Sequence, residues 1–190
     1  APILYNAATK RGCWFNRLIT TAPIAELARL PFPPEVCGGL ATGLSLLGHG
    51  KQAVPGDSFD WTRAVFEGNP LTSYRERFYR NVDVRDVAPG LAAGPPTIGW
   101  LIAACDAMGR IESEKFAPKI RVPSLLVVAG DDRIVSNKAI EALSSRLRAG
   151  TQIVLRGARH EILQEPDAIR EQFWAAFDAL APGVAMRKTA

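Results

Sequence analysis

The last third of the chain alternates short apolar runs with amphipathic helical patterns. The runs SLLVVA at 124–129 and QIVL at 152–155 have the length and composition of buried parallel strands. One helical pattern follows the capping residue Ser136 and ends at Gly150, and a second follows Pro166. Their apolar positions are Ile140, Leu143 and Leu147 in the first helix, and Ile169, Phe173, Trp174, Phe177 and Leu180 in the second. This order of elements predicts a right-handed βαβ unit of a doubly wound α/β sheet.

The first 23 residues predict a short helix and one more strand of the same sheet. Pro2 fits the first turn of a helix in APILYNAATK. RLITTAPI at 17–24 has the pattern of a short buried strand that ends at Pro23. The positions expected to share the apolar face of the helix are Ile3, Leu4, Ala7 and Ala8.

Residues 24–120 are rich in proline and glycine and show helical patterns without strand alternation. The segment 72–81 is charged and predicts a solvated helix capped by Thr72 or Ser73, and 98–108 predicts an apolar helix. An apolar stripe at helical spacing is formed by Val36, Leu40, Leu44 and Leu47. We therefore expect an inserted, mostly helical lid. The expected divisions are the first helix and strand of the core at 1–23, the cap or lid at 24–120, the C-terminal part of the core with the Asp and His loops at 121–181, and a frayed tail at 182–190.

The candidate chemistry lies on the two loops that leave the predicted strands at 124–129 and 152–155. One loop carries Asp131 and Asp132, and the other carries His160. Carboxyl ends of neighbouring parallel strands meet at one sheet edge, where sites form. An Asp bound to one imidazole nitrogen fixes the tautomer and leaves the other nitrogen as a general base. The alternative is a surface histidine and an Asp that only caps the helix near Ser136; spacing alone leaves both open.

Five stretches resemble a known family: RLITTAP, FEGNPLTSYRERF, GPPTIGW, IRVPSLLVVAGDDRIV and GARHEILQEPDAIREQFWAAFDAL. Through them, residues 17–180 resemble the C-terminal part of an α/β-hydrolase of the lysophospholipase and monoacylglycerol lipase group, which is serine aminopeptidase S33-like. The resemblance implies hydrolysis of a small-molecule lipid ester by a Ser-His-Asp triad, with no cofactor. It places the base on His160 and its partner on Asp132, with Asp131 as the second choice.

The nucleophile of such a triad is missing from these 190 residues. No G-x-S-x-G occurs, and GLSLLG at 43–48 has the wrong spacing, so Ser45 is interpreted as structural. The resemblance places the nucleophilic serine just before Ala1, with the oxyanion hole also outside the chain. We therefore expect a fragment of a longer enzyme that is inactive on its own.

Other side chains carry weaker hypotheses. Trp61 and Trp100 are candidates for lining an acyl-chain groove, although aromatic residues of a lid also serve as ordinary packing. HEILQ at 160–164 has Gln164 where a zinc motif needs its second histidine, so we expect no metal. His49 and Glu161 are interpreted as solvent-facing.

Composition narrows the partners and the compartment. Three cysteines without a CxxC pattern, and no secretion signal in APILYNAATK, favour free thiols in the cytoplasm. The net charge of +4 is spread without charge runs, which argues against nucleic acid. It is compatible with peripheral contact with the anionic inner face of a membrane.

Two other functions remain open at this level. The same fold serves serine peptidases and other small-ester hydrolases, because fold does not fix substrate. A module that binds an apolar ligand or a partner, without catalysis, would also keep the helical insertion. A G-x-S-x-G motif encoded directly upstream of Ala1 would favour an enzyme over such a module.

Overall fold

The computed structural model of the 190-residue chain describes residues 1–55, 65–91 and 94–182. In chain order the elements are α1 (Pro2–Ala8), β1 (Leu18–Thr21), α2 (Pro34–Leu44), η1 (Ser45–His49), α3 (Arg75–Val87), η3 (Pro89–Leu91), α4 (Ile98–Glu112), η4 (Ala117–Lys119), β2 (Ser124–Ala129), α5 (Asn137–Arg146), β3 (Gly150–Leu155), η5 (Ile162–Gln164) and α6 (Asp167–Leu180).

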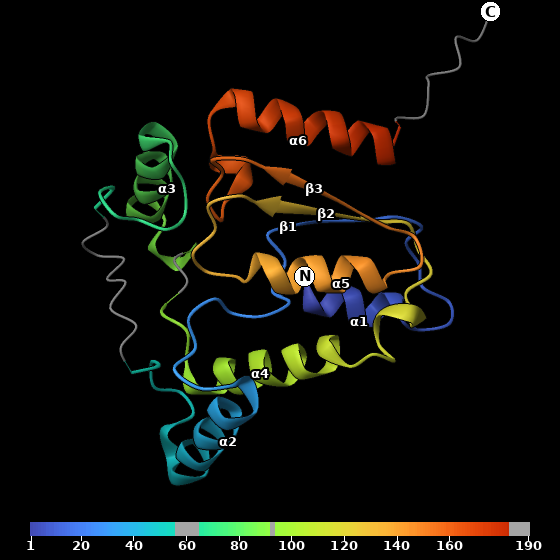
Figure 1. Ribbon diagram of the computed structural model, residues 1–190. Coiled ribbons are helices and arrows are strands. Elements are labelled where there is room, and N and C mark those ends of the chain that lie inside the picture. Colours follow the sequence, from blue (N-terminus) through green and yellow to red (C-terminus); the bar gives the residue numbers. More distant parts are fainter. Residues whose placement is uncertain (56–64, 92–93, 183–190) are drawn as a thin grey trace, which may run out of the picture.

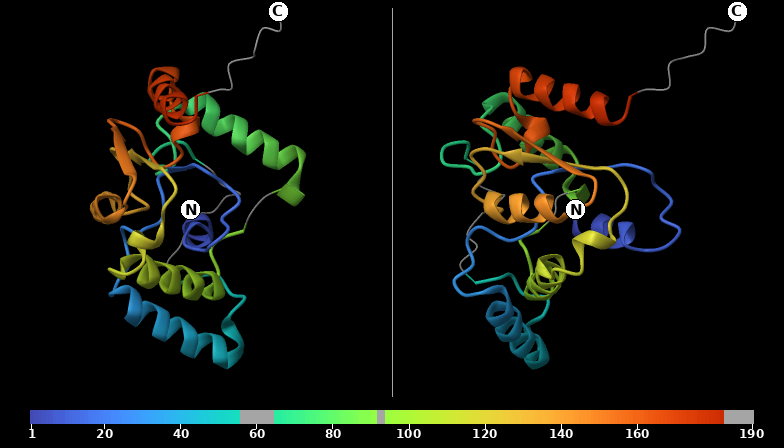
Figure 2. Two further views of the ribbon diagram at one scale, coloured as in Figure 1. Left: turned by 90° about the vertical axis from the view of Figure 1, so that its right-hand side faces the viewer. Right: turned by 45° about the vertical axis from the view of Figure 1, so that its right-hand side comes forward.

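The described strands form a parallel sheet in the order β1-β2-β3. Ser124 at the start of β2 is opposite Leu18 on one side and Gly150 on the other. Helix α6 covers one face of the sheet, and α1 and α5 lie on the opposite face (Figures 1 and 2). This arrangement confirms the predicted α/β class. It also brings the loops after β2 and β3 to the same edge.

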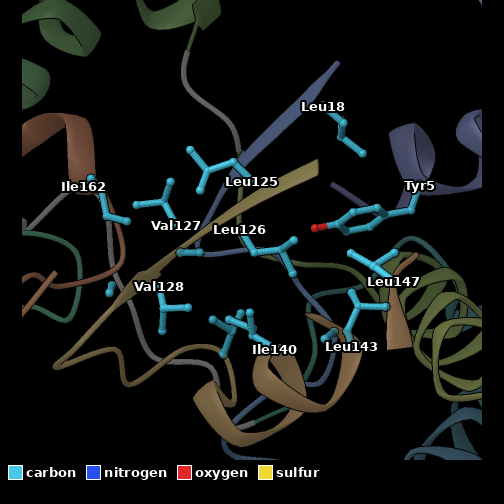
Figure 3. Packing of buried hydrophobic residues seen from close by; sticks show 14 of the residues in the cluster. Tyr5, Leu18, Leu125, Leu126, Val127, Val128, Ile140, Leu143, Leu147 and Ile162 are labelled. Atoms are coloured by element: carbon cyan, nitrogen blue, oxygen red, sulfur yellow. The ribbon is translucent and has the colours of Figure 1, made fainter. Parts of the chain in front are cut away.

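The central strand β2 is the middle of the core, and all six of its residues are buried. Leu125 and Val127 point to one face of the sheet, whereas Leu126 and Val128 point toward α5 (Figure 3). Burial on both faces explains the uninterrupted apolar run, since a half-exposed strand would alternate polar and apolar residues. The strand is therefore a rigid base for the loop that follows it.

Helix α1 buries a different face from the one expected. Tyr5 and Ala8 are buried, whereas Ile3 is 84% exposed and Leu4 is also exposed. The phenol of Tyr5 forms a 2.7 Å hydrogen bond with the Thr20 hydroxyl in β1, so the face of α1 that carries Tyr5 is directed at the sheet. Burial raises the pKa of Tyr5 more than the bond to Thr20 lowers it.

Helices α2, α3 and α4 lie in the chain between β1 and β2. Helix α2 packs on α4 through Cys37 and Ala41, and a Cβ added at Gly38 would lie 3.1 Å from Cys105 Cβ. The stripe formed by Val36, Leu40, Leu44 and Leu47 is exposed. The predicted helical spacing is confirmed, but these residues do not form its buried face.

Three predicted element details are wrong. Helix α3 begins at Arg75, because the side chains of Thr72 and Ser73 contact residues 164 and 165 and do not cap it. Helix α5 ends at Arg146, and Gly150 is the first residue of β3. Trp174 in α6 is exposed, while Phe173 packs into the core.

Among the described helices, none has both the length and the apolar character needed to cross a bilayer.

Candidate active site

The loops after β2 and β3 are joined by backbone hydrogen bonds at the carboxyl edge of the sheet. Gly130 N–H donates to the Leu155 carbonyl at 2.9 Å, and Asp131 N–H donates to the Ala158 carbonyl at 2.8 Å. A Cβ at Gly130 would lie only 2.9 Å from the oxygen of Leu155, so the approach requires glycine. The close contact at Gly130 fixes where Asp132, two residues further on, faces the second loop.

The carboxyl group of Asp132 joins the two loops. Its Oδ1 accepts hydrogen bonds from the backbone N–H groups of Ile134 (2.7 Å) and Val135 (3.1 Å). Its Oδ2 lies 2.9 Å from Nδ1 of His160. The predicted Asp–His contact is therefore present, and Asp132 makes it, whereas Asp131 is exposed.

Helix α5 has its own cap, which removes the alternative role for Asp132. The hydroxyl of Ser136 accepts a hydrogen bond from Ala139 N–H at 3.2 Å, as predicted for the capping residue. Asp132 instead stabilises the turn that precedes Ser136 and binds the histidine.

The hydrogen bonds to Asp132 outweigh the effect of its burial. Burial by itself would raise the pKa of this carboxyl group. The bonds from His160, Ile134 and Val135 lower it further than burial raises it, so the pKa lies below the ordinary value. Asp132 thus faces His160 as a carboxylate, with its side chain 0% exposed.

His160 is held by one ring nitrogen and is open at the other. Its side chain is 24% exposed, and Gly157, at a φ of 76°, allows the loop to turn back toward β2. With Nδ1 bound to Asp132, the favoured neutral tautomer carries its proton on Nδ1. The Nε2 atom of that tautomer is an acceptor, as a general base requires.

The neighbour of His160 is less solvated than expected. Glu161 is half-buried, and its backbone N–H donates to the Leu71 carbonyl at 2.8 Å. Burial raises the pKa of the Glu161 carboxyl group, and the nearby His160 opposes that rise.

The structure places the remaining candidate residues apart from the Asp–His pair or leaves them untested. Trp61 lies outside the described residues. Trp100 is on α4 and lines a cavity of about 400 Å³ with residues of α1, and Asp132 and His160 are not among those lining residues. Ser45 and His49 lie in η1, which follows α2 below the sheet (Figure 1). Within residues 1–55, 65–91 and 94–182, no three His, Cys, Asp or Glu residues form a metal-binding group.

Sequence reasoning missed the buried Glu165 and its contacts with segment 69–73. The stretches FEGNPLTSYRERF and GARHEILQEPDAIREQFWAAFDAL contain these residues, but nothing in either stretch marks the contact between them. Asn137, whose amide donates to the Ala129 carbonyl at the end of β2, was also missed.

Comparison of the sequence with known families decides the relationship. Residues 1–167 match the family described as serine aminopeptidase, S33. The chain belongs to this family. Asp132 and His160 both lie within the S33 match.

Two curated bacterial proteins are similar in sequence. Probable lysophospholipase L2 of Haemophilus influenzae is 29% identical over 156 residues, which cover 82% of this chain and 48% of that protein. Lysophospholipase L2 of Escherichia coli K12 is 31% identical over 117 residues, covering 58% of this chain and 34% of that protein. The S33 chain thus spans about half of the first relative and a third of the second.

Solved structures show the same fold. Monoglyceride lipase of Saccharomyces cerevisiae superposes with a TM-score of 0.67 at 14% identity, covering 94% of this chain and 60% of that one. A carboxyl esterase of Bacillus coagulans gives a TM-score of 0.68 at 18% identity, covering 96% and 61%. These likenesses show an α/β-hydrolase fold for the S33 chain.

The close approach at Gly130 predicts a selective loss of stability. We expect Gly130→Ala to lower the free energy of unfolding by about 1–3 kcal/mol, because the new methyl group meets backbone atoms that cannot rotate away. Urea denaturation followed by circular dichroism measures this change. The control is Gly109→Ala in α4, where nothing lies within 4 Å of the added Cβ and helix propensity improves. Equal urea midpoints for the two variants would contradict the steric account.

Proposed function

We propose that this chain is the base-bearing portion of a lipid-ester hydrolase, of lysophospholipase or monoacylglycerol lipase type. The observation that carries the proposal is the 2.9 Å contact between His160 Nδ1 and the buried Asp132, which leaves Nε2 open. The two curated relatives are lysophospholipases by name, which favours a lysophospholipid ester over other esters. No cofactor is required for this chemistry.

In the proposed mechanism, His160 moves a proton twice. Nε2 takes the proton of a serine hydroxyl as the serine oxygen attacks the ester carbonyl carbon. The resulting imidazolium is stabilised by Asp132 and gives its proton to the departing alcohol oxygen, leaving an acyl-serine. A water molecule then attacks the acyl carbon, with Nε2 accepting its proton and returning it to the serine oxygen.

The proposal requires a nucleophile from outside these 190 residues, because they contain no G-x-S-x-G motif. We place that serine in a segment that precedes Ala1, together with the donors of the oxyanion hole. Trp61 and Trp100 remain proposed contacts for the acyl chain.

The family description supports a second candidate, a serine peptidase on the same site. The same base and orienting carboxylate serve both reactions, so the Asp132–His160 pair does not separate them. An aminoacyl nitroanilide assayed beside a lysophospholipid distinguishes the two, and our proposal expects turnover of the lysophospholipid.

We expect the 190-residue chain to show no labelling by a fluorophosphonate probe, and a longer chain with the upstream serine to be labelled. In the longer chain, His160→Ala and Asp132→Asn should each lower kcat on a lysophospholipid by at least roughly 10³-fold, because the serine loses its base or the base loses its orientation.

The matched control for that experiment is Asp131→Asn, which removes the neighbouring, exposed carboxylate and should retain most activity. A labelled serine within residues 1–190 would overturn the placement of the nucleophile. Full activity in His160→Ala would overturn the mechanism.

We also propose peripheral contact with a lipid surface through the exposed side of α2 and η1. These two elements expose Val36, Leu40, Leu44, Leu46 and Leu47, and no charged residue occurs between Val36 and Gly48. An exposed apolar helical face next to a basic residue, Lys51, suits the interface of an anionic bilayer. The contact would bring the proposed site to its lipid substrate.

For this contact we expect Leu47→Glu to weaken binding to phosphatidylglycerol vesicles on the order of tenfold, because a leucine proposed to enter the apolar part of the bilayer is replaced by a charge. Flotation of vesicles with the 190-residue chain measures it. Val87→Glu in α3 is the control, since Val87 is 86% exposed, comparable to Leu47 at 75%, but lies on another helix. Equal losses in both variants, or no binding by the unsubstituted chain, would contradict the proposal.

A further inference from the structure

Glu165 is a buried carboxyl group that the proposed hydrolysis does not use. Its side chain is 0% exposed. Its oxygens accept hydrogen bonds from Arg159 N–H at 2.9 Å, from Ser73 N–H at 3.0 Å and from the Ser73 hydroxyl. A carboxylate in such a position is unfavourable unless it is fully hydrogen-bonded. The bonds from Ser73 join the His160 loop to segment 69–73, and the bond from Arg159 lies within the loop.

Segment 69–73 also contacts the residues on either side of His160. The guanidinium Nη1 of Arg159 donates to two backbone carbonyl oxygens of the segment, at 2.9 and 3.0 Å. On the other side, Glu161 N–H donates to the Leu71 carbonyl at 2.8 Å. His160 therefore lies between two residues that are both fixed to the same short segment.

The segment is also held by hydrogen bonds of its own. Asn69 Oδ1 accepts from the N–H groups of Leu71 (2.9 Å) and Thr72 (3.0 Å), and its amide donates to the Phe66 carbonyl at 2.6 Å. The hydroxyl of Thr72 donates to the Gln164 carbonyl at 2.9 Å. Asn69 and Thr72 are both buried, so water does not compete for these bonds.

We propose that Glu165 is a positioning residue for His160, acting through Arg159 and Ser73. A general base must be held to a fraction of an ångström, and one hydrogen bond to Asp132 leaves the ring free to swing with its loop. Glu165 and segment 69–73 form a clamp that fixes the loop itself. This role rests on the proposed function of His160 as the base.

Because the clamp segment belongs to the insertion between β1 and β2, the proposal makes the insertion part of the catalytic geometry. A movement of segment 69–73 would displace Arg159 and Glu161 together, and with them His160.

The test uses Glu165→Gln in the 190-residue chain, because the substitution keeps the size but replaces an acceptor oxygen by a donor amide. We expect the Glu161 amide hydrogen, bonded to the Leu71 carbonyl, to exchange about tenfold faster. The amide of Ile140 in α5 should keep its rate. Correlation of ring protons with ¹⁵N should show His160 changing from one tautomer, protonated on Nδ1, to a mixture. His49, outside the clamp, is the internal reference.

Glu141→Gln is the matched control, since Glu141 is exposed on α5 and should change neither readout. Ser73→Ala is a milder second variant that removes one hydroxyl donor and should shift both readouts less, in the same direction. This variant decides the question if Glu165→Gln does not fold.

The proposal is overturned if both variants leave Glu161 exchange and the His160 tautomer unchanged. It is also overturned if all amides accelerate equally while the tautomer stays single, which is the result for a purely structural role. An unsubstituted chain without a dominant Nδ1–H tautomer would contradict the proposed base, while the Glu161 exchange rate would still decide the clamp.

Discussion

The site depends on how closely two loops approach at one edge of a parallel sheet. Because β2 and β3 pair from Ser124 to Ala129, their following loops emerge side by side. The absence of a side chain at Gly130 lets the backbone of one loop reach Leu155 of the other. Asp132 is thereby held against His160. The burial of β2 on both faces makes this edge rigid. The same strand therefore forms the middle of the core and holds the loop that carries Asp132.

A second set of contacts ties the part of the chain between β1 and β2 to the same edge. Among the described residues, no lysine or arginine forms a salt bridge with Glu165. Its carboxyl oxygens accept hydrogen bonds from N–H and O–H donors instead. Arg159, which could have paired with it, donates hydrogen bonds to backbone carbonyls of segment 69–73. The polar groups around His160 are thus used to join chain segments that lie about ninety residues apart, as the 92-residue separation of Ser73 and Glu165 shows.

Sequence patterns over a few residues predicted the features that depend on neighbouring residues. The apolar run at 124–129, the cap at Ser136 and the loops bearing Asp132 and His160 all follow from short-range spacing. The face of α1 was mispredicted because the Tyr5–Thr20 bond is a tertiary contact. The start of α3 was mispredicted because Thr72 and Ser73 bind residues 164 and 165 across the fold. Such polar contacts between distant segments leave no periodic trace, so the bonds of Arg159 and Glu165 to segment 69–73 could not be predicted from sequence.

Titration of the Asp132 side-chain carboxyl carbon by ¹³C NMR tests most directly whether Asp132 is a carboxylate stabilised by His160. We expect a midpoint below the ordinary value of 3.8. Since the folded-state pKa is the lower one, the stabilisation is present above the unfolded value and is lost as pH falls through the folded value. His160→Ala should raise the midpoint. A midpoint at or above 3.8 that His160→Ala does not move would contradict the account.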